Sequence, residues 1–194
     1  IAHLRALGKV QLLEEKMISE KPRSKLGIAH TRWATHGEPS EENAHPHKSN
    51  ERVFIVHNGI IENYLDLKDF LKKEGYSFSS QTDSELIAHM LEYFLSKDNT
   101  MLDAMYLTKE KLDGAYAIAA IDKEDDKNII IARSKSPLLI GVGIDEFLAA
   151  SDPLAIGQLT NEFIFLEDGD VAQISSQSYN TVSYTHLRAH ETCE

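Results

Sequence analysis

Four stretches of the chain place apolar residues at the three- and four-residue spacing of an amphipathic helix. Pro22 ends the first stretch, because proline cannot continue a helix, and Gly75 follows the second as a left-handed stop. Asn63 is a suitable cap for the second helix, and Thr82 with Glu85 matches a capping box in front of the third. We therefore predict helices over residues 8–20 (inward residues Val10, Leu13 and Met17), 63–75 (Leu65, Leu67, Phe70 and Leu71), 82–95 and 100–112.

Short segments with a high β propensity make up most of the remaining pattern. Two of them, 26–31 and 52–57, flank a long loop rich in Gly, Pro, Asn and His. After Gly114 the predicted strands follow one another with connections too short for crossover helices, which indicates antiparallel pairing in an α+β domain. These later strands are predicted at 115–122, 128–133, 138–142, 146–150 and 162–175, the last broken at Asp168–Gly169.

The composition is that of one globular domain. The chain has 194 residues, of which 42% are hydrophobic and 26% charged, so a packed core is expected. The longest apolar runs, 128–132 and 137–144, are far shorter than the ~18 to 20 residues of a membrane helix. A net charge of -11 opposes binding to a polyanion. We therefore expect a soluble protein with neither a membrane nor a nucleic acid as its partner.

The two ends of the chain carry separate signals. Residue 1 is Ile rather than Met, and the opening residues resemble the middle of a domain, so we expect a truncation upstream. Residues 182–194 continue no earlier pattern and resemble a translated adaptor sequence, so we divide the chain into a truncated domain, 1–181, and a non-native tail, 182–194. The single cysteine, Cys193, lies in that tail, and the absence of a secretory signal favours the cytosol.

The densest cluster of reactive side chains lies in the long loop and its flanking strands, and it holds most of the histidines. Imidazole is a common metal ligand, but the spacing includes neither a His-Glu-x-x-His helix nor a cysteine pair, so we predict no metal site. His30 and His57 are better interpreted as hydrogen-bonded structural residues at strand ends.

Four residues of this region suit the recognition of an amino acid. The Arg32 guanidinium matches an α-carboxylate, although Arg32 and Trp33 could equally be a surface cation on an indole. Asp83 could bind an ammonium group, or it could simply complement a helix dipole. Asn58–Gly59 has the sequence of a hairpin turn, but the apolar run continues beyond it. The side-chain amide of Asn58 and the N–H of Gly59 are therefore candidates for an oxyanion hole.

Four sequence blocks in order then form a family pattern that covers residues 1–181. Together they resemble the glutaminase domain of the glutamine–fructose-6-phosphate aminotransferase (isomerising) family, the glucosamine-6-phosphate synthases, which are class II glutamine amidotransferases. The resemblance implies an N-terminal-nucleophile hydrolase fold, a four-layer αββα sandwich of two antiparallel sheets between helical layers. The blocks are His30–Ser40 (HTRWATHGEPS), Asn43–His47 (NAHPH), Val56–Asn63 (VHNGIIEN) and Thr82–Glu85 (TDSE).

The resemblance also implies roles for particular residues. Asn58 and Gly59 would form the oxyanion hole, Arg32 would bind the carboxylate of L-glutamine and Asp83 its ammonium group. Trp33 would gate the passage of ammonia. Thr35 and His36 would also surround the glutamine. No cofactor is implied.

Family chemistry begins with an N-terminal cysteine thiolate, whose place in the family lies upstream of Ile1. We therefore expect the 194-residue chain to be inactive and to release no glutamate from glutamine. The parent enzyme is expected to be a homodimer that passes ammonia to fructose 6-phosphate in downstream domains, giving glucosamine 6-phosphate and glutamate. Two alternatives stay open: a class II amidotransferase of the phosphoribosyl-pyrophosphate type, and a non-catalytic glutamine-binding module.

Overall fold

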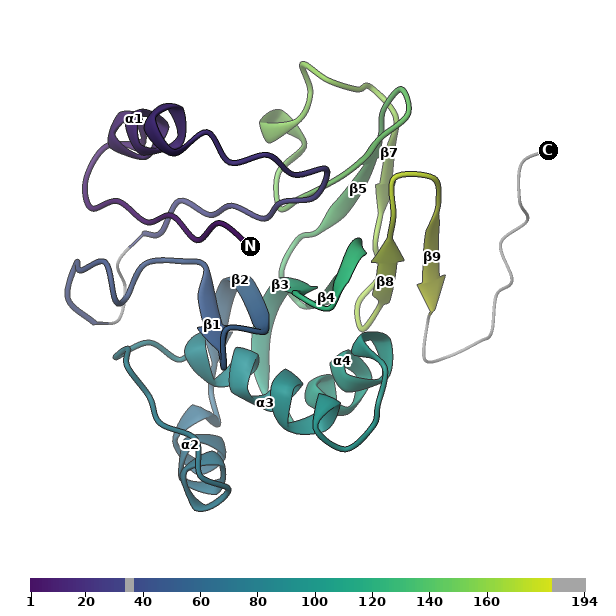
Figure 1. Cartoon of the computed structure of the whole chain (residues 1–194). Coiled ribbons are helices and arrows are strands. Elements are labelled where there is room, and N and C mark those ends of the chain that lie inside the picture. Colours follow the sequence, from purple (N-terminus) through teal and green to yellow (C-terminus); the bar gives the residue numbers. More distant parts are fainter. Residues whose placement is uncertain (34–36, 183–194) are drawn as a thin grey trace.

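A computed structural model describes residues 1–33 and 37–182 of the chain. Two antiparallel sheets form its centre (Figure 1), one with the strand order β1-β2-β3-β4-β8-β9 and one with the order β6-β5-β7. The predicted α+β class is therefore confirmed. The strands are β1 (His47–Ser49), β2 (Val53–Ile61), β3 (Gly114–Asp122), β4 (Asp125–Ser134), β5 (Leu139–Val142), β6 (Phe147–Ala150), β7 (Phe163–Phe165), β8 (Val171–Ile174) and β9 (Tyr179–Val182).

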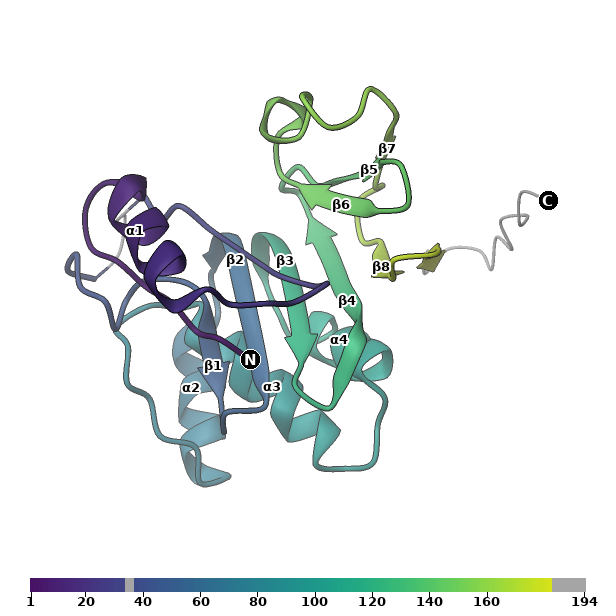
Figure 2. The ribbon, with the colours of Figure 1, turned by 45° about the horizontal axis from the view of Figure 1, so that its top comes forward.

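Helices cover one face of the six-stranded sheet. Figure 2 shows α2, α3 and α4 on the same side of β1, β2 and β3. The side chains between these layers, such as Ile55 and Ile118 from the sheet and Leu86 and Met90 from α3, are almost fully buried and form the larger core. The helices are α1 (Val10–Glu20), α2 (Tyr64–Lys73), α3 (Glu85–Leu95) and α4 (Met101–Lys109), with a short 3-10 turn, η1 (Pro153–Ala155).

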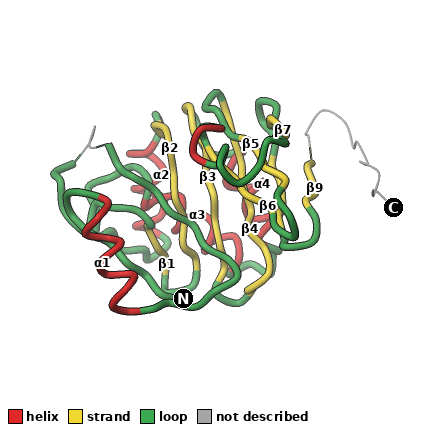
Figure 3. Tube along the Cα trace, turned by 90° about the horizontal axis from the view of Figure 1, so that it is seen from above, coloured by secondary structure: helices red, strands yellow, loops and turns green. Residues whose placement is uncertain are grey.

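The second sheet packs against the other face. Ile131 of β4 and Ala172 of β8 meet Ile140 of β5 in a second, smaller core. Seen from above in Figure 3, the strands form the middle of the molecule, and α2, α3 and α4 lie beneath them. Helices α2–α4, the six-stranded sheet and the three-stranded sheet thus form three successive layers. None of the described helices is long and apolar enough to cross a bilayer.

The side chains of β2 point alternately to the two faces of the six-stranded sheet. Val53, Ile55 and Ile61 belong to the core under the helices, so the odd-numbered residues of β2 face α3. The even-numbered residues therefore face the opposite side, where His3 contacts Phe54 edge to face with ring centroids 5.4 Å apart. This alternation determines the directions of Asn58 and Gly59, the two residues of the predicted site that lie in β2.

Three local predictions were wrong, and nonlocal contacts explain two of them. No strand forms at 26–31 among the described residues. The Asn63 side chain does not cap α2, because its amide bonds to the α4–β3 connection at Lys111 and Asp113. The Thr82–Glu85 capping box is absent, because Thr82 Oγ1 lies 3.1 Å from His47 Nε2 and the Glu85 carboxylate binds Ser79 and Ser80.

The burial predicted for the first two helices was only partly correct. α1 ends as expected, with Lys21 in the left-handed conformation, but none of its residues is buried, and Val10 and Met17 are half exposed or more. In α2 only Leu71 is buried, while Leu65 is 62% exposed. The long loop also contains a strand that was not predicted, β1, and β9 was missed as well; its last residue is Val182.

Candidate functional site

The Asn58–Gly59 pair lies within β2 rather than in a hairpin turn. Asn58 pairs with Ala117 and Gly59 with Tyr116 of β3 in an unbroken antiparallel register that continues to Ile61. The pair therefore forms no hairpin turn, and β2 continues past the predicted end of the strand at residue 57.

The direction of the Gly59 N–H follows from the same register. The N–H of Glu62 donates to Asp113 at 2.8 Å, on the β3 side of the strand. The N–H groups of successive strand residues alternate between the two edges, so those of Ile61 and Gly59 point away from β3. The N–H of Ile61 donates to Asp83 Oδ2 at 2.8 Å. The N–H of Gly59 is thus directed to the edge of β2 where Asp83 lies.

Gly59 also has a steric reason to be glycine. Its φ of 145° lies in the region that other residues rarely adopt, and a Cβ built there would be 2.0 Å from the carbonyl oxygen of Ala115. The backbone of β2 therefore approaches β3 more closely at this point than a side chain permits.

Asn58 is exposed and, being even-numbered, presents its amide on the sheet face opposite α2–α4. Its side chain rises from the sheet plane, whereas the Gly59 N–H lies in that plane and points outward. These two directions can meet at one atom next to the strand edge. Such a pair of donors is suited to a negatively charged oxygen that develops during a reaction.

Asp83 lies at this edge of β2, just before α3, and both it and the next residue, Ser84, are hydrogen-bonded to β2. Its carboxylate holds the N–H of Ile61, and next to it the hydroxyl of Ser84 lies 2.9 Å from Nδ1 of the buried His57. Asp83 was predicted at the first position of a helix, but α3 begins at Glu85. The Asp83 carboxylate is therefore fixed by its hydrogen bond to the edge of β2, and Asp83 lies two residues before the start of α3.

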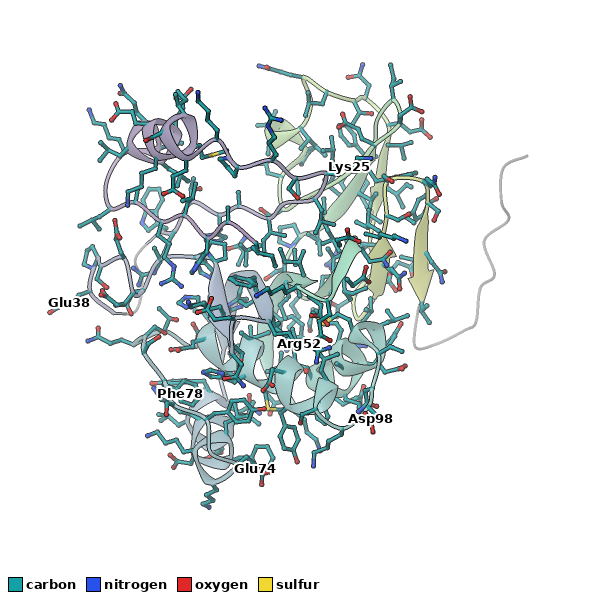
Figure 4. The ribbon with its side chains drawn as sticks, viewed as in Figure 1. Lys25, Glu38, Arg52, Glu74, Phe78 and Asp98 are labelled. Carbon is teal, nitrogen blue, oxygen red and sulfur yellow. The ribbon has the colours of Figure 1, made fainter. Side chains whose placement is uncertain are left out.

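Arg32 lies on the chain segment that crosses the sheet face opposite the helices. Its guanidinium donates to the carbonyl oxygens of Gly37 at 3.3 Å and Glu38 at 3.5 Å. Figure 4 shows Glu38 at the tip of this loop, on the same side of the molecule as Phe78, which precedes α3. Trp33, the only tryptophan, is 90% exposed. Thr35 and His36 lie outside the described residues.

Two amide side chains join the Arg32 loop to the Asp83 loop. Asn43, only 3% exposed, donates from Nδ2 to the carbonyl of Glu38 at 2.9 Å and accepts the N–H of Gln81 at 2.8 Å. The side-chain oxygen of Gln81 in turn accepts the N–H of Glu38 at 3.2 Å. The segments predicted to bind the α-carboxylate and the α-ammonium group of one amino acid are thus bonded together, although 38 residues separate Asn43 from Gln81.

Histidines pack beside these loops. The rings of His30 and His45 are 4.1 Å apart, and those of His45 and His47 are 4.7 Å apart. Burial lowers the pKa of His47 to about 3, and burial likewise lowers the pKa of His57 to about 4 against the opposing charge of Asp83. Among the described residues, no group of three or more His, Cys, Asp or Glu side chains is arranged to hold a metal ion.

Sequence reasoning missed the residues that hold the loops in place. Asn43 and Glu85 lie inside the recognised blocks, but Asn43 received no role and Glu85 only that of a capping-box residue. Gln81 lies next to one of the blocks. Only their burial next to the site residues distinguishes these side chains. The sequence of a loop does not reveal burial, because it has no periodic pattern of apolar residues.

Comparison with known proteins gives one family match and a consistent set of relatives. A model of the glutamine amidotransferase domain matches residues 30–158. The glutamine–fructose-6-phosphate aminotransferase (isomerising) of Vibrio parahaemolyticus is 48% identical over 188 residues, which cover 97% of this chain and 31% of that protein. The enzyme of the same name from Haemophilus ducreyi is 51% identical over 172 residues, which cover 89% of this chain and 28% of that protein. The chain therefore spans less than a third of the length of these relatives.

Solved structures give the same fold. The glutamine phosphoribosylpyrophosphate amidotransferase of Bacillus subtilis, complexed with ADP and GMP, superposes with a TM-score of 0.66 at 26% identity, over 79% of this chain and 33% of that one. A second structure, described as the allosteric regulatory enzyme of purine biosynthesis, gives a TM-score of 0.67 at 28% identity, over 79% of this chain and 34% of that one. The arrangement of sheets and helices is thus similar to that of these two enzymes.

Proposed function

The chain belongs to the family of glutamine amidotransferase domains, and from that premise we propose that it is the glutaminase part of a longer enzyme. That enzyme would transfer the amide nitrogen of L-glutamine to fructose 6-phosphate and release glutamate. Relatives about 50% identical over nearly the whole chain carry that activity in their names, whereas the solved phosphoribosylpyrophosphate amidotransferase is only 26% identical. We give the sequence relatives more weight, because a shared fold does not specify the ammonia acceptor.

One observation carries the proposal. The Asp83 carboxylate is bonded to the N–H of Ile61, and the N–H of Gly59, two residues away, points to the same edge of β2. An anion for the ammonium group and a donor for the amide oxygen are therefore presented along one strand edge. Glutamine has these two groups at its opposite ends.

The remaining roles follow from chemistry. Arg32 would take the α-carboxylate, because a guanidinium forms two parallel hydrogen bonds to a carboxylate. On binding, glutamine would replace the long contacts of Arg32 to Gly37 and Glu38. Thr35 and His36 would complete the surroundings of the glutamine, and Trp33 would line the exit for ammonia. A homodimeric parent enzyme in the cytosol, with residues 1–181 as the glutaminase domain, belongs to the same proposal.

Replacing Asp83 with asparagine is expected to weaken glutamine binding by ~10- to 100-fold, because a hydrogen bond to a charged group contributes about 1.5–3 kcal/mol. Binding is measured by titration calorimetry and by the fluorescence of Trp33, the only tryptophan. Asp83→Asn should hardly change the affinity for glutaramate, the analogue that lacks the α-amino group.

Asp152→Asn is the matched control. Asp152 also accepts a backbone N–H, from Leu154 at 2.9 Å, but it caps η1 next to the second sheet. The control should bind glutamine like the wild type. Equal loss of affinity for glutamine and glutaramate in Asp83→Asn would refute the ammonium-binding role, and a wild-type chain that binds neither would refute the proposed function.

A further inference from the structure

Glu85 is a buried carboxylate whose hydrogen bonds all reach back to the loop before α3. It is the first residue of α3 and only 3% exposed. Its Oε1 accepts the N–H of Ser79 at 2.9 Å and the hydroxyl of the same serine at 2.8 Å. Its Oε2 accepts the N–H of Ser80 at 2.6 Å and lies 3.1 Å from the N–H of Ser79.

These contacts keep Glu85 ionised. Burial alone raises the pKa of its carboxyl, but the contact with His89 and the hydrogen bonds from Ser79 and Ser80 outweigh burial and hold the pKa below its usual range. Nε2 of His89 lies 3.6 Å from Oε1, so the backbone donors are the closer partners. Complementing the dipole of α3 would not require such burial, because an exposed acid at a helix start does the same.

The loop that Glu85 holds leads directly to Asp83. Glu85 fixes its beginning at Ser79 and Ser80, and the bond from Ile61 to Asp83 fixes its end. Between them, Gln81 is bonded to Asn43, and Thr82 Oγ1 lies 3.1 Å from His47 Nε2. Without Glu85, the backbone N–H groups of Ser79 and the buried Ser80 would lose their acceptor, which favours a rearranged loop.

We propose that Glu85 is a positioning residue that clamps residues 79–83 and thereby sets the Asp83 carboxylate at the edge of β2. The proposal rests on the proposed function, because the position of Asp83 matters only if an ammonium group binds there. Glu85 itself does not touch the substrate. Its effect should therefore appear in how well the site distinguishes glutamine from an analogue without the ammonium group.

The test compares two acid-to-amide variants of the 194-residue chain. Glu85→Gln should weaken L-glutamine binding by ~10-fold or more, as expected when charged hydrogen bonds are lost, with a smaller effect on glutaramate. Hydrogen exchange of residues 79–83 should become faster. The control is Asp122→Asn, a 6% exposed carboxylate in β3 that accepts hydrogen bonds from Arg52, the residue before β2. It should lower thermal stability but leave both affinities within ~2-fold of the wild type.

A milder variant covers the case in which Glu85→Gln does not fold. Ser79→Ala removes only the hydroxyl contact and should weaken glutamine binding by ~2- to 5-fold. Wild-type affinity in Glu85→Gln, or an equal loss for glutamine and glutaramate, would overturn the clamp alone. If Glu85→Gln does not fold, wild-type affinity in Ser79→Ala would overturn it. Absence of glutamine binding by the wild type would instead refute the proposed function.

Discussion

Replacing Asn58 with alanine is expected to lower the turnover number for glutamine hydrolysis by ~10²- to 10³-fold, with a much smaller change in KM. The reason is that an oxyanion donor gains strength only as negative charge develops on the amide oxygen. The side chain of Asn58 is exposed and rises from β2 beside the outward-pointing N–H of Gly59, so its loss should hardly affect folding. The measurement is steady-state glutamate release by the full-length enzyme that carries this domain with its nucleophile.

Asn128→Ala provides the control for this variant. Asn128 lies on β4, where its amide is bonded to Asp125 and Gln173 and has no contact with the predicted site. Its replacement should leave turnover within ~2-fold of the wild type at a temperature where the protein is folded. If Asn58→Ala raised KM and left the turnover number unchanged, Asn58 would be binding the ground-state amide, and the oxyanion role would be wrong.

The strands after residue 114 could be predicted well because they are local. Each is a short apolar or alternating segment, a pattern that can be recognised without information from distant parts of the chain. The predicted strands at 115–122 and 128–133 correspond to β3 (Gly114–Asp122) and β4 (Asp125–Ser134). The same holds for the helix at 100–112, whose cap, Thr100, accepts the N–H of Asp103.

Two of the failures, the predicted caps of α2 and α3, occurred where a side chain had another partner in the fold. Thr82 and Glu85 have the spacing of a capping box, but the buried His47 and the backbone of Ser79 and Ser80 compete for the same atoms. Sequence separation hides such competition, because His47 is 35 residues away. Local propensity therefore predicted helix α3 correctly, but it predicted side-chain capping bonds at the start of the helix that do not form.

The predicted site residues show the same division. Asn58, Gly59 and Asp83 come from two segments that the β2 register and the Ile61–Asp83 bond bring to one strand edge. The types of these residues suggested their chemistry. The supporting residues, Asn43 and Gln81, could not be found in this way, because amides in loops carry no periodic signal and gain importance only through burial.

Stability in mild acid is expected to depend on the histidines packed next to the site. His47 and His57 are 1% and 3% exposed, and burial lowers their pKa values to about 3 and about 4. Arg5 further lowers the pKa of His47, while Glu85 opposes it, and Asp83 opposes the shift at His57. Burial between two other histidines also holds the pKa of His45 far below its usual range.

The sign follows from proton linkage. Below pH ~6.5 these histidines take up protons in the unfolded chain but stay neutral in the folded chain. The free energy of unfolding should therefore fall as the pH drops from 6.5 towards 4, by up to ~1.4 kcal/mol per pH unit for each histidine. Carboxylates ordinarily titrate below ~4.5, so the loss between pH 6.5 and 4.5 belongs mainly to the histidines.

Urea unfolding of the wild type and of His47→Gln at a series of pH values tests this expectation. The variant loses the contact to Thr82 and should be less stable at pH 7.5, but its stability should fall less steeply between pH 6.5 and 4.5. An identical slope in the two proteins would mean that His47 is protonated in the folded chain or absent from the linkage.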